Sequence, residues 1–222
     1  MRNPHPQTRR LSKPQDLSNR SVQVKCCQLE RMTFDMTAWF CNRRPDDPGL
    51  QGIVKIMKII SGLAIENRYL PGSIGRITEL HGVYYSRHWG FGQYFESKVA
   101  VELSEFIDRY DQRRDRIWLA ILNDRVEGSL VIDGYHAGDR GAHLRWFIVS
   151  EALQDKGIGR ALMNKAMKYC RERNYKKIYL WSFKGLHAAR RLYEDMGFRL
   201  VRQQHGLQWG VEVEEQYFEL VR

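Results

Sequence analysis

The chain divides into a first part without a regular pattern of apolar residues and a second part in which apolar residues recur at fixed intervals. Five of the six prolines lie within residues 1–50, and this density of breakers argues against long helices or strands there. From about residue 59 the spacing becomes regular. We therefore expect a weakly ordered appendage over residues 1–56 and one globular domain over residues 57–222.

The regular part predicts strands and helices in alternation. Short apolar or alternating runs predict strands at Ile59–Leu70, Arg116–Leu122, Val126–Ile132, His143–Val149, Lys177–Phe183, Phe198–Gln203 and Glu215–Val221. Helical spacing of apolar residues predicts helices at Gly75–Tyr85, Gln93–Tyr110, Gly159–Arg173 and Leu186–Met196. On the first helix this spacing selects Ile77, Leu80, Tyr84 and His88 as one face. The order of elements predicts an α/β fold with a mixed central sheet of about seven strands and flanking helices.

Charge adds little to this picture. The net charge is +10, and residues 1–56 hold half of it, with ten Lys and Arg against five Asp and Glu. The domain is thus only mildly basic, and nucleic acid is not expected as a partner. The N-terminus lacks the apolar stretch of a signal peptide, and Ile53–Ile65 is too short and too charged to cross a membrane. We expect a cytoplasmic protein, with Met57 as an alternative start of translation.

The four cysteines do not form a metal site or an evident nucleophile. Cys26, Cys27, Cys41 and Cys170 match no zinc-binding spacing, so we expect free thiols and no bound metal. Cys170 shares the apolar face of its helix with Met163, Ala166 and Met167. This position predicts a packed thiol rather than a catalytic one.

A glycine-containing segment between a strand and a helix carries the clearest chemical pattern. It reads Gln154-Asp155-Lys156-Gly157-Ile158-Gly159 and leads into the helix Gly159–Arg173. The first turn of a helix presents unpaired N–H groups and the positive end of the helix dipole, and glycine lets a ligand come close. Lys156 and Arg160 add positive charge, so the segment predicts a pyrophosphate site. The alternative is a tight turn without a ligand, and the segment matches neither a dinucleotide-binding motif nor a P-loop.

Two motifs resemble a known family. Phe147-x-Val149 followed by Gln154-x-x-Gly157-x-Gly159 is similar to the acetyl-CoA-binding motif of the GCN5-related N-acetyltransferases (GNAT). Downstream, residues 189–198 resemble that family's Ala-x-x-x-Tyr-x-x-x-Gly-Phe segment. The resemblance covers about residues 60–222, and residues 81–85 with the stretch through Phe95 are similar to acetyltransferase domains sometimes fused to MarR-type regulators. Leu186 and Glu151 depart from the family pattern, which has Asn and Pro there.

The resemblance implies transfer of an acetyl group from acetyl-CoA to a primary amine, by direct attack in a ternary complex. It implies that the strand ending at Val149 splays from its neighbour, so that free main-chain groups bind the coenzyme and polarise the thioester. Tyr193 is then the general acid that protonates the leaving thiolate; the alternative is that Tyr193 only packs. The expected coenzyme-binding residues are Phe147, Ile148, Val149, Gln154, Lys156, Gly157, Ile158, Gly159 and Arg160.

The acceptor is less well defined by the sequence. The resemblance places His81 and Tyr84 in the acceptor-lining region, and Glu127 is an acid in a central strand. Arg145 lies two residues before Phe147, so strand alternation predicts the same face for both and suggests a partner for an acidic group of the acceptor. For each of these four residues, a purely structural role is the alternative. We expect a small-molecule or peptide amine as acceptor and no membrane; a homodimer and a non-catalytic acyl-CoA-binding or regulatory module stay open.

Overall fold

The computed structural model describes residues 62–222. Three predictions concern residues outside this range: the appendage over residues 1–56, the alternative start at Met57, and the free thiols of Cys26, Cys27 and Cys41. Within residues 62–222, no helix has the length and apolar character needed to cross a bilayer.

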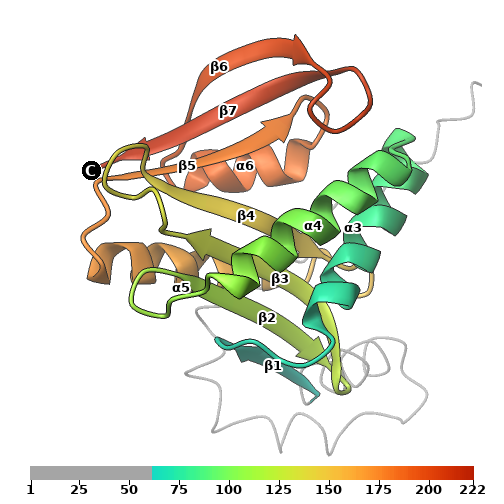
Figure 1. Cartoon of the computed structure of the whole chain (residues 1–222), viewed down its shortest axis with the longest axis horizontal. Coiled ribbons are helices and arrows are strands. Elements are labelled where there is room, and N and C mark those ends of the chain that lie inside the picture. Colours follow the sequence, from blue (N-terminus) through green and yellow to red (C-terminus); the bar gives the residue numbers. More distant parts are fainter. Residues whose placement is uncertain (1–61) are drawn as a thin grey trace, which may run out of the picture. The chain divides into compact units, whose positions relative to one another are not determined.

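A seven-stranded mixed sheet forms the centre of the described domain (Figure 1). Its spatial order is β1-β2-β3-β4-β5-β7-β6, and only the contact between β4 and β5 is parallel. The strands are β1 (Leu63–Glu66), β2 (Arg116–Leu122), β3 (Arg125–Asp133), β4 (Ala142–Val149), β5 (Lys177–Phe183), β6 (Arg199–Gly206) and β7 (Val213–Val221). The predicted α/β class and strand number are confirmed.

The hairpin of β2 and β3 shows how local sequence sets the register. Its two turn residues, Asn123 and Asp124, adopt φ values of 51° and 60°. Two successive left-handed residues match the twist of the flanking strands, and Asn and Asp tolerate this conformation better than most residues. The turn pairs Leu122 with Arg125 and so sets the register up to a bulge at Glu127, beyond which Gly128 pairs with Ala120.

Within residues 62–222, the helices α3 to α6 lie on the two faces of the sheet (Figure 1). The helices α3 (Ser73–Trp89) and α4 (Gln93–Asp108) contribute to one apolar cluster with the sheet, and α5 (Ile158–Glu172) and α6 (His187–Asp195) contribute to the other. The buried side chains Phe95, Val99, Leu103 and Phe106 of α4 follow helical spacing, as predicted.

The buried face of α3 differs from the predicted one in its second half. Ile77 is fully buried, but His88 is exposed and its Nε2 lies 3.1 Å from Glu151 Oε1. The buried stripe continues instead from Ile77 through His81, and Tyr85 packs against Phe91 and Phe95. The predicted stripe runs from Ile77 through Leu80 and Tyr84 to His88, but helical spacing from Ile77 also leads to His81 and Tyr85, which lie on the packed side of α3.

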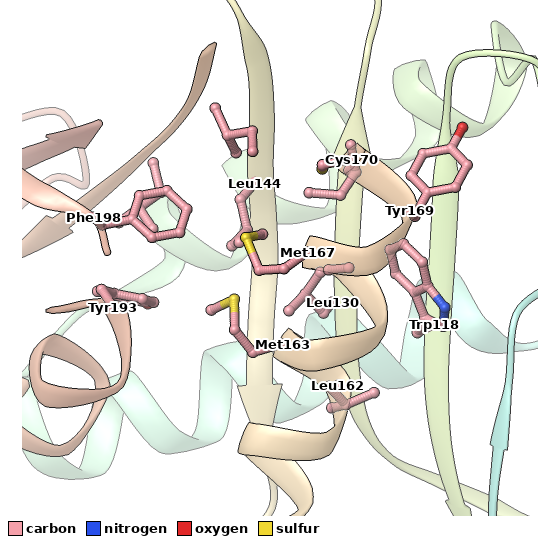
Figure 2. Packing of buried hydrophobic residues seen from close by; sticks show 14 of the residues in the cluster. Trp118, Leu130, Leu144, Leu162, Met163, Met167, Tyr169, Cys170, Tyr193 and Phe198 are labelled. Carbon is pink, nitrogen blue, oxygen red and sulfur yellow. The ribbon is translucent and has the colours of Figure 1, made fainter. Parts of the chain in front are cut away.

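The second cluster packs α5 and α6 against β4. Met163, Met167 and Cys170 of α5 are buried, and Figure 2 shows the two methionines on the side of α5 that faces Tyr193 and Phe198. Burial raises the pKa of Cys170 to about 12, so its thiol stays protonated. The prediction that Cys170 packs inside the domain is confirmed.

Candidate active site

The parallel contact between β4 and β5 is short, and the two strands separate beyond it. Their register consists of Ala142 with Ile178 and His143 with Tyr179. Residues 144–149 of β4 stay paired with β3, and residues 180–183 of β5 stay paired with β7. Each strand therefore keeps one neighbour and presents its other main-chain edge to the gap. The predicted splay of the strand ending at Val149 is present.

A bulge in β4 lies opposite Leu130 of β3, within the separated segment. The register between β3 and β4 shifts between Ser129 and Val131, and Trp146 has a φ of 45°. This left-handed value is costly for a bulky residue. Two contacts hold it: Ser129 Oγ donates to the Trp146 carbonyl at 2.6 Å, and the Arg145 guanidinium lies 4.0 Å from the Trp146 ring centroid.

The bulge makes one sequence prediction wrong. Alternation placed Arg145 and Phe147 on the same face, but the extra residue puts them on opposite faces. Arg145 binds Glu102 of α4, whereas Phe147 packs in the cluster of α5 and α6, 6.2 Å from the Tyr193 ring. Strand alternation holds only where the pairing is uninterrupted.

A cavity of about 280 Å³ opens where β4 and β5 separate. Its walls come from α3, α4, both separated strands, α6 and the loop between β6 and β7. One side is aromatic, with Phe91, Phe95, Phe183 and Trp209. The other side carries the polar groups Lys98, Glu102, His143 and Arg145. Tyr193 also lines this cavity, so the predicted general acid lies beside the gap between the strands.

Tyr193 is held by aromatic packing. Its ring lies 5.7 Å from Phe218 and 6.3 Å from Phe198, and the residue is 6% exposed. Its hydroxyl has no hydrogen-bond partner among residues 62–222. Burial raises the pKa of Tyr193 above its ordinary value, because the charged phenolate loses its hydration. The side chain therefore stays a neutral O–H donor next to the cavity.

The loop before α5 leaves main-chain donors unused. Gly157 caps the helix with a φ of 77°, and Asp155 also has a positive φ of 57°. The Ala161 amide donates to the Gly157 carbonyl at 3.0 Å, so the amides of Ile158, Gly159 and Arg160 belong to the first turn. Such amides have no carbonyl of their own helix in reach. Together with the helix dipole they suit a phosphate group.

Glycine suits the two positions of the loop for different structural reasons. Gly157 needs its positive φ, and a β-carbon there would meet nothing within 4 Å. A β-carbon at Gly159 would lie 3.4 Å from Phe147 Cζ and 3.8 Å from Val149 Cγ2, so this position brings α5 close to β4. One glycine shapes the loop, and the other packs the helix onto the strand that borders the gap.

The side chains around the loop attach it to its surroundings. Gln154 Nε2 donates to the Val149 carbonyl at 3.0 Å, which ties the loop to the end of β4. Lys156 bonds to the Ala152 carbonyl, and Arg160 lies 2.5 Å from Asp195 Oδ2 on α6. Lys156 and Arg160 both stay exposed beside the first turn of α5. The structure thus brings these three predicted residues together at one end of the separated strands.

The predicted acceptor residues fall in different places. His81 and Arg145 line the cavity, whereas Tyr84 and Glu127 do not. His81 is buried, its Nδ1 lies 2.8 Å from the Ile77 carbonyl, and burial lowers its pKa to about 4. Glu127 accepts a 2.7 Å hydrogen bond from Arg76 of α3. Tyr84 is partly exposed, next to His88.

Several cavity residues were not found from the sequence. Lys98 and Glu102 lie one turn apart on α4, 2.5 Å from each other, and Glu102 reaches Arg145, 43 residues away. Gln208 and Trp209 come from the loop between β6 and β7. The spacing of Lys98 and Glu102 is visible in the sequence, but a salt bridge of this spacing is usually a surface feature. The packing of the β6–β7 loop against α4 is a long-range contact without a local pattern.

Comparison with known proteins identifies the family. Residues 76–198 match the model of the Acetyltransferase (GNAT) family. The chain belongs to this family. The match contains the predicted coenzyme loop and Tyr193, and it ends at Phe198. The mixed sheet and its helices are therefore of the GNAT type, as the motifs indicated.

Curated relatives are distant. The chain is 30% identical over 118 residues to the human N-acetylaspartate synthetase, over 52% of this chain and 38% of that protein. The Xenopus tropicalis N-acetylaspartate synthetase is 29% identical over 119 residues, which cover 53% of this chain and 43% of that protein. The chain thus spans less than half the length of these relatives. An uncharacterized N-acetyltransferase of Archaeoglobus fulgidus is 30% identical over 122 residues, 82% of its length.

Solved structures share the fold at low identity. A putative GNAT acetyltransferase from Desulfovibrio desulfuricans matches 72% of this chain and 98% of its own, with a TM-score of 0.57 and 18% identity. The Salmonella typhimurium yncA, a putative acetyltransferase with acetyl-CoA bound, matches 72% of this chain and 94% of its own, with the same TM-score and 17% identity. The Vibrio cholerae spermidine N-acetyltransferase, with CoA and spermine, matches 72% and 96%, with a TM-score of 0.55 and 22% identity.

Proposed function

We propose that this chain is an acetyl-CoA-dependent N-acetyltransferase. The observation that carries the proposal is the separation of β4 from β5 between the loop before α5 and the cavity that Tyr193 lines. Acetyl-CoA has a diphosphate, a long amide-containing arm and a reactive thioester. The loop before α5, the free strand edges of the gap and the cavity beside Tyr193 match these three parts in turn.

The residues present fit acetyl-CoA as a co-substrate. The first-turn amides of Ile158, Gly159 and Arg160 would hold the pyrophosphate, with Lys156 and Arg160 adding charge. The free edge of Phe147, Ile148 and Val149 would bind the arm. The bound coenzyme supplies an acyl group activated as a thioester, and main-chain N–H groups of β4 would stabilise the oxyanion that forms during transfer.

In this proposal the protein orients the acceptor and the thioester and supplies one proton. The acceptor nitrogen forms a bond to the acyl carbon, the carbon–sulfur bond breaks, and the nitrogen loses a proton to solvent. We assign Tyr193 as the acid that donates its hydroxyl proton to the leaving sulfur. A buried phenol stays neutral at physiological pH, so it holds a proton that it can donate.

The main rival is a non-catalytic acyl-CoA-binding or regulatory module. The observation that favours it is the aromatic packing of Tyr193, which gives the residue a structural reason without chemistry. The narrower resemblance of residues 81–85 to acetyltransferase domains fused to MarR-type regulators remains a prediction. Among acceptors, the names of the relatives suggest two opposite chemistries, an acidic amino acid and a polyamine.

The test is an acceptor screen with the full-length protein and acetyl-CoA, in which release of the free thiol is followed together with the mass of each acceptor. The proposal predicts thiol release that depends on an amine, and an acceptor mass raised by one acetyl group. Tight binding of acetyl-CoA without transfer to any amine would favour the binding module. Absence of both binding and transfer would contradict the assignment of the loop as well.

A further inference from the structure

A second cavity adjoins the first on the side of the sheet that carries α3 and α4. Its volume is about 320 Å³, and it shares His143 and Arg145 with the cavity that Tyr193 lines. Its other lining residues come from the end of α4, the end of β3, the loop between β3 and β4, and β5: Arg109, Asp133, His136, Arg140 and Tyr179. A molecule that extends from one cavity into the other passes Arg145.

The side chains that line the two cavities carry an excess of positive charge. Four are cations and two are carboxylates, a formal charge of +2 with histidine neutral: Lys98, Arg109, Arg140, Arg145, Glu102 and Asp133. Asp139 lies 3.8 Å from Arg140 outside the cavity and reduces the excess to +1 when it is included. Burial lowers the pKa of His143 to about 3, so this histidine adds no charge at neutral pH.

Both carboxylates are already occupied. Glu102 lies between Lys98, at 2.5 Å, and Arg145. Asp133 receives two hydrogen bonds from Arg109, at 2.6 and 3.0 Å, and Arg145 lies 3.6 Å away. Each carboxylate thus has two cationic partners. A positively charged ligand would have to displace one of them.

Among the four cations, Arg140 is the one without a close ionic partner in the described residues. Within residues 62–222, Asp139 at 3.8 Å is the ionic partner of Arg140, whose side chain is 61% exposed. Guanidinium groups present donors in a planar fork that matches a carboxylate. An anionic group placed between Arg140 and Arg145 would therefore gain hydrogen bonds without breaking an existing close pair at Arg140.

We propose that the acceptor is an amine that also carries a carboxylate, such as an amino acid or a short acidic peptide. The amine lies in the first cavity beside Tyr193, and the carboxylate lies in the second cavity at Arg140 and Arg145. This inference rests on the proposed acetyltransferase function and selects one acceptor chemistry. A polyamine, with several positive charges and no anion, is the acceptor that these cavities suit least.

The experiment compares acceptors that differ only in the carboxylate. With the full-length protein and saturating acetyl-CoA, thiol release is measured for β-alanine against ethylamine, for 5-aminopentanoate against butylamine, and for spermidine. The carboxylate-bearing member of each pair is expected to have a kcat/KM at least about tenfold higher, the size of one charge-assisted hydrogen bond. Equal use of both members, or preference for spermidine, would overturn the inference and leave the acetyltransferase function standing.

A variant pair locates the effect. Arg140→Gln is expected to reduce the preference for the carboxylate, expressed as the ratio of the two kcat/KM values, by about tenfold. Arg171→Gln, an exposed residue of α5 that lines neither cavity, is the control and should leave the ratio unchanged. An unchanged ratio in Arg140→Gln with normal acetyl-CoA binding would refute the site. Absence of thiol release with every amine would instead refute the proposed function, and this inference with it.

Discussion

Substitution of Gly157 tests whether the conformation of the coenzyme loop matters for binding. Gly157 has a φ of 77° and a ψ of 1°, and an added β-carbon would meet nothing within 4 Å. The cost of alanine is therefore conformational, about 1–2 kcal/mol for the left-handed region. The lower entropy of the unfolded chain returns about 0.4–1 kcal/mol. We expect Gly157→Ala to lower the free energy of unfolding by about 1 kcal/mol.

The effect on binding should be larger than the effect on stability. If alanine moves the loop out of the left-handed region, the first-turn amides no longer converge on the pyrophosphate. Loss of one charge-assisted hydrogen bond costs about 1.5–3 kcal/mol, which corresponds to a rise of about 10- to 100-fold in the Kd for CoA. Gly157→Asn should bind more tightly than Gly157→Ala, because asparagine adopts left-handed values more readily.

Gly159→Ala is the matched control for this experiment. Its β-carbon would approach Phe147 Cζ to 3.4 Å, a contact that a small shift of the ring relieves. Alanine also favours the helix, so we expect stability and the Kd for CoA to stay close to wild type. Isothermal titration calorimetry with CoA and urea denaturation give both quantities. Wild-type affinity in Gly157→Ala, or a larger loss in Gly159→Ala than in Gly157→Ala, would refute this account of the loop.

Three further predictions concern the framework of the site. Ser129→Ala removes the hydroxyl that donates to the Trp146 carbonyl, so it should destabilise the domain by about 1–3 kcal/mol in urea denaturation and lower kcat; wild-type stability would show that the bulge does not need this bond. Burial lowers the pKa of His81 to about 4. Because the unfolded chain binds this proton near pH 6.5, stability should fall as the pH drops from about 6.5 to about 4, by up to about 3 kcal/mol. His81→Asn should lose less over the same range, and an identical pH dependence would contradict the role of His81. Glu127→Gln weakens the 2.7 Å ion pair with Arg76, so we expect a stability loss of about 1 kcal/mol and an unchanged kcat, since Glu127 lines neither cavity; a tenfold fall in kcat would show instead that Glu127 takes part in the reaction.

Much of the fold follows from local sequence. The bounds of β2 and β5 agree with the predicted residues, because each is a short apolar run between turn residues. The helix α6 ends where predicted, since Gly197 adopts a φ of 91° after it. Elements of this kind are determined by residues within a few positions of one another, so the sequence pattern is sufficient.

The site could be predicted from the sequence only in part. The coenzyme loop could be located, because a glycine-containing turn at the start of a helix is a general arrangement for binding phosphate. The bulge at Trp146 could not be located, because the strand contains no glycine or proline there and its last four residues are all apolar, so no residue marks a break in the pairing. The prediction that Arg145 and Phe147 share a face was wrong for this reason, whereas the role of Arg145 toward the acceptor stays a prediction. The wall formed by Gln208 and Trp209 depends on packing between elements more than a hundred residues apart in the chain.

The assignment of Tyr193 as the general acid can be tested directly by one comparison. With acetyl-CoA and the best acceptor of the screen, kcat is measured for wild type, Tyr193→Phe and Tyr85→Phe, the second being the other tyrosine that lines the cavity. We predict that Tyr193→Phe lowers kcat by about 100-fold or more and changes the Kd for acetyl-CoA little, while Tyr85→Phe keeps most of its activity. Full turnover in Tyr193→Phe would contradict the assignment of the general acid.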